Sequence, residues 1–316
     1  MKPSIVVVGS TNTDMVIKTE RLPSPGETVL GGTFFMNQGG KGANQAVAAK
    51  RLGGNVTFIS TTGNDIFGTQ SLQLFKDEGL NLDYMVSDVI NPSGIALITI
   101  DNKGENCIVV ASGANARLCP DDLKIAIKAI QNASIVLMQL EIPLETVNYV
   151  AALAKSNGVN VILNPAPACE LPLTMLRNIS IITPNKKEAE ILSGIKITDS
   201  TTLYRAAEAI RQKGVESVII TLGSGGAFVC TGEIKEIIKA PKVISVDTTG
   251  AGDVFNGALA LAITENRSLI DAVTFACHAA ALSVTKFGAL SSAPFRNEAD
   301  TFFECRSKEK PVDELR

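Results

Sequence analysis

Short runs of β-branched residues alternate with amphipathic helical segments from about residue 130 onward, and this alternation constrains the fold more than any other feature. The runs are SIVLMQL, VNVILN, ISIITPN and ESVIITLG. Strands that alternate with helices form parallel sheets, because each parallel connection needs a long crossover that is usually a helix. We therefore predict an α/β protein with a mostly parallel central sheet and helices on both of its faces, which gives three layers.

Polar residues stand at the ends of these runs, where parallel sheets bind their ligands. In chain order they are Glu141, Asn164, Asn185, Thr221 with Gly223, and the loop 247–253, which follows a fifth strand-like run, KVISV. Any one of them is compatible with an ordinary turn. Five polar groups in the same topological position predict a ligand site at one edge of the sheet.

The N-terminal part of the chain has a different pattern. After a buried strand, IVVVG, two segments at about residues 11–36 and 92–112 contain alternating, hairpin-like stretches. We predict that they form a small β-sheet outside the main layers, within a single domain that spans residues 1–316. An open sheet needs one face covered, so this sheet would act as a lid or as a dimer surface. Two such lids paired across a two-fold axis would give a homodimer.

Composition and charge exclude several classes of function. The chain of 316 residues has 29 basic and 32 acidic side chains, and its net charge of −3 favours a small-molecule partner over nucleic acid or an anionic membrane. The first apolar run is too short for a signal peptide and no run is long enough to span a membrane, so we predict a cytoplasmic protein. The six cysteines form no CxxC pair and suit free thiols in a reducing compartment. The single histidine, His278, excludes multi-histidine zinc sites.

Residues 247–260, DTTGAGDVFNGALA, form a glycine-rich turn followed by an apolar, helix-like run. One interpretation is structural: Gly250 and Gly252 let the chain turn, and Asp253 caps the helix. The other is chemical: backbone N–H groups at the helix start hold an anion, and Asp253 takes a proton from an attacking hydroxyl. A helix N-terminus is expected to lower the pKa of Asp253, which matters little if the transition state of phosphoryl transfer is loose. The stretch alone leaves both interpretations open.

A second glycine-rich turn enters a helix at residues 37–54, NQGGKGANQAVAAKRLGG. It lacks the spacing of an ordinary P-loop, and the later GSGG lacks the spacing of the dinucleotide fingerprint, which argues against a dehydrogenase. Two separated glycine turns suit two ligands, a polyol at the first turn and a nucleotide phosphate at the second.

Two short polar motifs each allow two interpretations. TNTD, residues 11–14, places Asn12 and Asp14 where they would bind vicinal hydroxyls, or where these two residues would form an Asx turn. NKKE, residues 185–188, places Asn185 and Glu188 one helical turn apart. That spacing suits a hydrated Mg²⁺ held mainly by nucleotide phosphates, and it suits an N-terminal helix cap equally well.

Taken together, these motifs resemble the ribokinase branch of the PfkB family of sugar kinases. GGKGANQAVAA is similar to the first signature of that family and DTTGAGDVFNGALA to the second. GSTNTD, MQLE, LNPAPA, TPNKKEAE and TLGSGG match the intervening motifs in order and spacing. The resemblance covers about residues 5–294, and seven motifs in order are far more specific than either signature alone.

The resemblance implies an activity and its rivals. The expected reaction is ATP-dependent phosphorylation of the primary (O5) hydroxyl of D-ribose, with Mg²⁺ and an activating K⁺. Rival substrates are 2-deoxyribose, fructose and nucleosides. The alternative from another class is a catalytically silent sugar-binding module on the same fold, which has no need of the base that Asp253 would supply.

The resemblance also assigns residues to the sugar and to the chemistry. Asp253 would be the base, and Gly250, Ala251 and Gly252 would form the anion hole. The sugar site would contain Asn12, Thr13, Asp14, Gly40, Lys41, Gly42, Ala43, Asn44, Glu141 and Asp253.

The nucleotide and metal sites follow from the same resemblance. The nucleotide site would contain Asn185, Thr221, Leu222, Gly223, Ser224, Gly225, Gly226, Gly252, Asp253 and Cys277. Glu188 would organise Mg²⁺ through water. K⁺ would be held, mostly through backbone carbonyls, at Asp247, Thr249, Ser283, Lys286, Gly288 and Ser292.

Two positions depart from the family pattern. Cys277 stands where many relatives carry histidine or asparagine beside the adenine, and His278 follows one residue later. A shift of one residue turns a helical side chain by about 100 degrees, so we assign Cys277, not His278, to the nucleotide side. Gly225 stands where relatives often carry lysine or arginine, which would weaken phosphate or base contacts there.

Overall fold

The computed structural model describes residues 3–308 and is built around an eight-stranded sheet with the strand order β14-β13-β12-β11-β10-β9-β1-β4. The strands from β4 to β12 in this order are parallel, and the two strands beyond β12 are antiparallel. Their bounds are β1 Ser4–Val8, β4 Asn55–Ile59, β9 Ile135–Met138, β10 Asn160–Leu163, β11 Ile181–Ile182, β12 Ser217–Thr221, β13 Ala227–Cys230 and β14 Lys235–Ile238. The predicted mostly parallel α/β sheet is confirmed.

Two hydrophobic cores lie on opposite faces of this sheet. Alternate residues of β1 point to opposite sides, so that Ile5 and Val7 join one core while Val6 and Val8 join the other. The first core is covered by α1 Lys41–Arg51, α2 Ile66–Asp77, α8 Ala251–Thr264, α9 Leu269–Ser283 and α10 Arg296–Lys308. The second is covered by α3 Ile127–Gln131, α4 Leu144–Ser156, α5 Leu173–Leu176, α6 Lys186–Ser193 and α7 Ser200–Arg211. The three predicted layers are therefore present.

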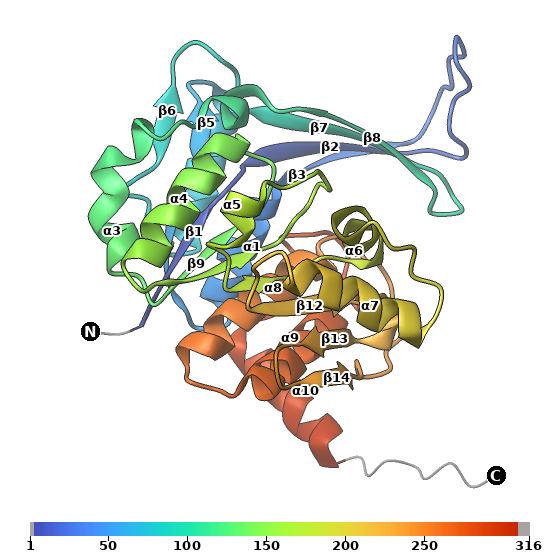
Figure 1. Ribbon diagram of the computed structural model, residues 1–316. Helices are drawn as coiled ribbons and strands as arrows, with labels where there is room; N and C mark the ends of the chain where they lie inside the picture. The colour runs from blue at the N-terminus through green and yellow to red at the C-terminus, as the bar shows by residue number, and fades with distance from the viewer. Residues whose placement is uncertain (1–2, 309–316) are drawn as a thin grey trace, which may run out of the picture.

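A separate four-stranded sheet reaches out from the body of the molecule (Figure 1). It has the order β3-β2-β7-β8, with β2 Asn12–Lys18, β3 Thr33–Gly39, β7 Gly94–Ile100 and β8 Asn106–Ala111. These strands come from the two segments predicted to form the small sheet, although β3 continues to Gly39. The remaining pair, β5 Thr61–Gly63 and β6 Val86–Asp88, lies beside the main sheet.

The fifth run that was expected to form a strand does not do so. Residues 242–246 have no strand structure and follow the edge strand β14 as an irregular segment, in which Ile244 is 89% exposed. The alternating pattern was misleading because three residues of the run, Lys242, Val243 and Ser245, line a cavity instead of pairing with a neighbouring strand. The segment is fixed by the N–H of Val246, which donates to the carbonyl of Val284 over 2.7 Å.

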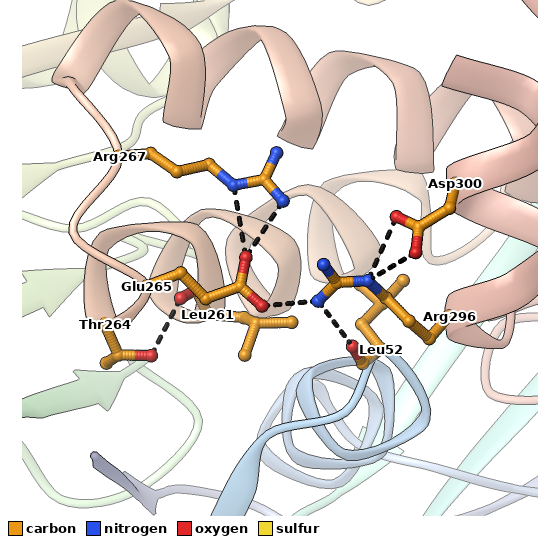
Figure 2. Close-up of polar contacts among 7 residues, drawn as sticks. All are labelled: Leu52, Leu261, Thr264, Glu265, Arg267, Arg296 and Asp300. Atoms are coloured by element: carbon orange, nitrogen blue, oxygen red, sulfur yellow. Dashed lines mark hydrogen bonds and ion pairs between the residues drawn. The ribbon is translucent and has the colours of Figure 1, made fainter. Parts of the chain in front are cut away.

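Helix α10 is fastened to the body of the protein through Arg296 (Figure 2). The guanidinium of Arg296 donates to the carbonyl of Leu52 at the end of α1, to Glu265 after α8 and to Asp300 within α10. Arg267 donates to the same Glu265 carboxylate through two nitrogens. In the described residues no helix is long and apolar enough to cross a membrane.

The cysteines were expected to be free thiols. In the part of the chain that the structure describes, Cys107, Cys119, Cys169, Cys230 and Cys277 are free. The side chain of Cys305 lies outside the described residues.

Candidate active site

An open cavity of about 580 Å³ lies where the chain after β9, the N-terminus of α1, the start of β2 and the end of β8 meet. Three predicted sugar-site residues, Asn12, Lys41 and Glu141, line it. The rest of the lining consists of Val110, Ser112, Asn115, Ala116, Leu140, Ile142, Pro143 and Pro167. The cavity is therefore shared between the main sheet and the end of the four-stranded sheet, from which Val110 comes.

Lys41 and Glu141 form a partly buried ion pair at this cavity. The ammonium of Lys41 lies 2.8 Å from Oε1 of Glu141, while Oε2 accepts from the backbone N–H of Lys41 and from the hydroxyl of Ser10. Burial raises the pKa of Glu141, but the Lys41 charge and these hydrogen bonds outweigh burial, so the pKa lies below its ordinary value. Glu141 is thus a fixed anion that orients the start of α1.

The first glycine turn is needed because the chain passes very close to β2. Gly40 has a φ of +88°, and a Cβ at this position would lie 2.8 Å from the backbone nitrogen of Asn12. A larger residue would therefore be strained by its φ and would push β2 away from α1. The glycine lets the N-terminus of α1 meet the polar end of β2.

Asn12 and Asp14 are placed by β2, in extended backbone, and the Asx-turn interpretation is wrong. The side-chain oxygen of Asn12 accepts from the amide of Asn115 at 2.8 Å. Burial, followed by the charge of Glu141, raises the pKa of Asp14 to about 7. The hydroxyl of Thr13, between them, is buried and has no hydrogen-bond partner among the described residues.

Asp253 lies in the first turn of α8 and does not cap it. Gly250 occupies the cap position with a φ of +75°, and a Cβ there would lie 2.8 Å from the Cα of Ala289. The Asp253 carboxylate instead accepts from the side-chain amides of Asn44 and Gln45, both at 2.9 Å. The expected cap is wrong because the side chain turns toward α1.

The expected lowering of the Asp253 pKa is also wrong. Burial dominates and raises the pKa of Asp253 to about 6, against the opposing influence of Lys41 and the two amides. The carboxylate is 8% exposed, so the loss of hydration exceeds the effect of the helix N-terminus. Asp253 is consequently a stronger base than its position in the sequence suggested.

A second cavity, of about 570 Å³, lies beyond the N-terminus of α8. Six predicted residues line it: Thr221, Gly223, Ser224, Gly226, Gly252 and Cys277, and Ala251 of the predicted anion hole lines it too. The lining residues that the sequence did not predict are Ala240, Pro241, Lys242, Val243, Ser245, Thr248, Phe255, Ala280, Ala281 and Val284. The helical spacing of Cys277, Ala280, Ala281 and Val284 was a usable signal of one apolar helix face.

Asn185 and Glu188 form a capping box at the start of α6. The N–H of Glu188 donates to the side chain of Asn185 at 2.9 Å, and the N–H of Asn185 donates to the carboxylate of Glu188 at 2.7 Å. Burial raises the pKa of Glu188. Neither residue lines the second cavity, and Leu222 and Gly225 do not line it either.

Cys277 and His278 point to different surroundings. Cys277 faces the second cavity, and burial raises the pKa of its thiol to about 12. The His278 ring packs against Phe303 with 4.8 Å between ring centroids, and its Nδ1 is 2.8 Å from the carbonyl of Thr274. His278 therefore belongs to the packing between α9 and α10.

The six residues expected at a K⁺ site lie in two segments, and the carboxylate of Asp247 accepts hydrogen bonds from both. Asp247 accepts from the N–H of Thr249 and from the N–H of Gly288, both at 2.9 Å. The hydroxyls of Ser283 and Ser292 donate to carbonyls within their own segments, and Lys286 pairs with Glu298. Within residues 3–308, no three acidic, histidine or cysteine side chains gather into a metal-binding group.

Several residues of the site were missed by sequence reasoning. Ser10 and Asn115 hold Glu141 and Asn12, and Gln45 and Gln139 lie in the buried polar network that contacts Asp253. Gln45 carried one signal, since it is a polar residue in an otherwise alanine-rich helical face. The others were visible only after the strands were placed side by side.

Comparisons with known proteins agree with this geometry. The profile described as pfkB family carbohydrate kinase matches residues 2–296. A ribokinase of Haemophilus influenzae is 44% identical over 304 residues, covering 96% of this chain and 99% of its own. A deoxyribokinase of Salmonella typhi is 35% identical, covering 92% and 95%. The structure of Arabidopsis thaliana ribokinase complexed with ribose and ATP is similar with a TM-score of 0.91 at 35% identity, covering 96% of this chain and 99% of that one. The chain belongs to the pfkB family of carbohydrate kinases.

Proposed function

We propose that this protein is an ATP-dependent ribokinase that transfers the γ-phosphate of ATP to O5 of D-ribose. One observation carries the proposal: the buried carboxylate of Asp253 stands between two cavities. It is bonded to Asn44 of the helix whose Lys41 lines the first cavity, and it is next to Gly252, which lines the second. The similarity to ribokinases at 39–44% identity over nearly the whole chain supports the same substrate.

The first cavity suits a small polyol. Asn12 and the Lys41–Glu141 pair line it with acceptors and a donor, and Asp14, whose pKa is influenced by Glu141 and Lys41, would add a further acceptor, which matches the alternating hydroxyls of a pentose. The oxygen of the Asn44 amide is buried without a partner among the described residues, so a sugar hydroxyl would satisfy it. Thr13, Gly40, Gly42 and Ala43 would complete the sugar site through the backbone.

Asp253 acts as the base. The sugar O5–H bond breaks as its proton moves to Asp253, O5 forms a bond to the γ-phosphorus, and the bond from that phosphorus to the bridging oxygen breaks to release ADP. With a pKa of about 6, Asp253 is mostly ionised at pH 7 and is better matched to this proton than an exposed aspartate. Backbone N–H groups of Gly250, Ala251 and Gly252, at the start of α8, stabilise the charge that develops on the phosphoryl oxygens.

The second cavity suits the nucleotide. Phosphates would lie toward Gly252 and the turn 221–226, while the apolar face of α9 with Cys277 would cover the base. Asn185 is close to this turn, since it forms a bridge with Thr221. Cys277 has a small thiol at the position beside the adenine where many relatives carry a larger side chain.

The residues present fit both metal ions. When bound, Mg²⁺ would neutralise phosphate charge, held mainly by ATP and by Glu188 through water. The absence of a three-residue acidic group within residues 3–308 agrees with that arrangement. The K⁺ set would offer backbone carbonyls and the one carboxylate of Asp247, whose pKa lies below its ordinary value because hydrogen bonds from Thr249 and Gly288 outweigh burial. This donor chemistry suits a monovalent cation beside Gly250.

The proposal extends to a single domain, a homodimer and a cytoplasmic location. The four-stranded sheet exposes apolar side chains, among them Phe34, Leu97 and Val109, which supports a lid that pairs with a second copy in a homodimer. The single-domain organisation is supported by the cores that run along the whole main sheet. A cytoplasmic location would supply the ATP that the reaction consumes.

The test is ADP release from purified protein with Mg-ATP and D-ribose, 2-deoxyribose, fructose or adenosine, each with and without K⁺. Fastest turnover with D-ribose, increased by K⁺, is expected. Fastest turnover with 2-deoxyribose or fructose would replace ribose as the substrate. No turnover with any of them, from protein that binds ribose in calorimetry, would favour the silent sugar-binding module.

A further inference from the structure

Asp253 has a second amide partner that touches neither cavity. One carboxylate oxygen accepts from Asn44, and the other accepts from Nε2 of Gln45 at 2.9 Å. Gln45 is fully buried and lines neither the sugar cavity nor the nucleotide cavity. Both ends of its amide are bonded within the protein, whereas the Asn44 oxygen has no partner among the described residues, so the Gln45 contact serves the carboxylate and not a ligand.

The hydrogen bonds of Gln45 permit only one orientation of its amide. Its nitrogen faces two acceptors, Asp253 and the side-chain oxygen of Asn164 at 3.1 Å. Its oxygen accepts from Nε2 of Gln139 at 2.6 Å. Because an amide has nearly the same shape when it is turned over, orientation is set by these partners alone. A turned Gln45 would place its oxygen against the Asp253 carboxylate and its nitrogen against the nitrogen of Gln139.

Gln139 bears the unsatisfied end of this chain of amides. It is fully buried at the end of β9, and its oxygen has no hydrogen-bond partner among the described residues. A Cβ on Gly9 would lie 2.0 Å from that oxygen, so Gly9 leaves the space in which the side chain fits. The unpaired acceptor of the network is therefore on Gln139 and not on Gln45, whose Nε2 donates to Asp253. A carboxylate needs a donor in this position because it only accepts hydrogen bonds.

We infer that Gln45 is a positioning residue for Asp253, and that Gln139 holds the Gln45 amide with its donor toward that carboxylate. The inference rests on the proposed role of Asp253 as the base. Two amides from neighbouring residues of α1 fix the plane of the carboxylate, so that its remaining lone pairs point in one direction. Gln139 follows strand β9 and donates to Gln45, so the direction of these lone pairs is fixed relative to β9.

The pKa of Asp253 depends on the groups around it, so a shift of this pKa is the measurable sign that the Gln45 hydrogen bond has been lost. Lys41 of α1 lowers the pKa of Asp253, Glu141 after β9 raises it, and Asp14 of β2 and Glu188 of α6 are also coupled to it. The Gln45 hydrogen bond stabilises the ionised form. Removing that bond raises the pKa of Asp253, so the acid limb of the pH–rate profile moves to higher pH.

The experiment compares the wild type with Gln45→Met, Gln139→Met and a control, Thr146→Val. The control also removes a buried hydrogen bond, 2.6 Å to the carbonyl of Leu118, from a side chain that lines neither cavity. Turnover is measured from pH 5 to pH 9, ribose affinity by calorimetry, and folding by thermal unfolding. Gln45→Met is expected to lower turnover about 10- to 100-fold, which is the size of effect that misplacing a catalytic group produces. Ribose affinity should change little, and Gln139→Met should act in the same direction by less.

A titration that needs no turnover separates this inference from the proposed function. The carboxyl carbon of Asp253 is followed by NMR in each protein, with Asp253→Asn identifying the signal. A higher midpoint in Gln45→Met and Gln139→Met, and an unchanged one in Thr146→Val, supports the inference even if ribose is not the substrate. Equal midpoints and parallel pH–rate profiles in all four proteins overturn it. Gln139→Met, which leaves Gln45 in place, decides the matter if Gln45→Met does not fold.

Discussion

Two polar clusters in this molecule use hydrogen bonds for different ends. Around Asp253, neutral amides surround one buried carboxylate, and the pKa of that carboxylate is raised because burial outweighs the charge of Lys41 and the two amide hydrogen bonds. Around Arg296, opposite charges meet near the surface, where the side chain is 36% exposed (Figure 2). The first cluster raises the pKa of a buried group, whereas the second holds a helix in place.

The Arg296 cluster lies where the match to the family ends. The profile match ends at residue 296, the first residue of α10. Arg296 donates back to Leu52, at the end of the helix that carries Lys41 and Asn44 at its other end. We therefore expect changes at Asp253 to alter chemistry without loss of stability, and changes at Arg296 to do the reverse.

The largest effect is expected from Asp253→Asn. An amide of the same size cannot accept the O5 proton, so kcat should fall by about 10²- to 10⁴-fold, the range found for loss of a general base. Removing a charge whose burial is unfavourable should leave the unfolding temperature equal or higher. Kinetics with D-ribose and a thermal melt measure both quantities. A turnover within threefold of the wild type would remove Asp253 from the mechanism.

The next effect is the pH dependence of ribose binding through Asp14. The pKa of Asp14 is raised from 3.8 to about 7 by burial and by Glu141. Sugar hydroxyls donate to the ionised form, so ribose affinity should rise with pH and level off above about pH 7, losing up to about tenfold per unit below it. Calorimetry from pH 5 to pH 8.5 tests this. Asp14→Asn, which has no such ionisation, should flatten the curve, and an equally steep curve in that variant would assign the effect elsewhere.

Asp14 also makes the stability of the sugar-free protein depend on pH. Because the folded pKa lies above the unfolded one, the folded state holds the proton more tightly. The contribution of Asp14 to stability is present below about pH 4 and is lost as pH rises toward about 7. At pH 8 without sugar, Asp14→Asn should therefore be more stable than the wild type.

The comparison between clusters also shows what sequence could predict. The edge that carries both cavities was indicated by polar residues after β9, β10, β11 and β12, because parallel strands bring those positions together whatever their neighbours are. The role of Asp253 as a cap and its lowered pKa were wrong, since both assumed only its own helix. Its surroundings come from α1, more than 200 residues earlier, which also supplies the amide of Gln45.

Misleading local patterns had the same cause. The run KVISV alternates like a strand, yet the sheet already ends at β14 and offers it no partner. NKKE fitted a metal motif and a capping box equally well, and the structure contains the capping box. The contacts of Arg296 with Leu52 and Glu265 span 244 and 31 residues, so no local signal announced them.

A smaller effect, on stability alone, is expected from Arg296→Ala. The change removes a donor to the Leu52 carbonyl, two carboxylate contacts and packing near the Phe275 ring. Because the group is partly exposed, we expect a loss of about 1–2 kcal/mol in the free energy of unfolding. Denaturant unfolding measures this loss, and kcat with D-ribose should stay within twofold. A large fall in kcat at unchanged stability would contradict the separation of the two clusters.

The smallest effect should come from Asp300→Ala, which removes one partner of Arg296 within α10. Asp300 is 46% exposed and four residues from Arg296, so the pair resembles the exposed helical ion pairs that contribute about 0.3–0.5 kcal/mol. A double-mutant cycle with Arg296→Ala isolates this term, and 0.5 M NaCl should reduce it. A coupling energy above about 2 kcal/mol would mean that the cluster behaves as a buried network. The cluster around Arg296 and the cluster around Asp253 would then differ in the chemistry of their side chains and not in how exposed those side chains are.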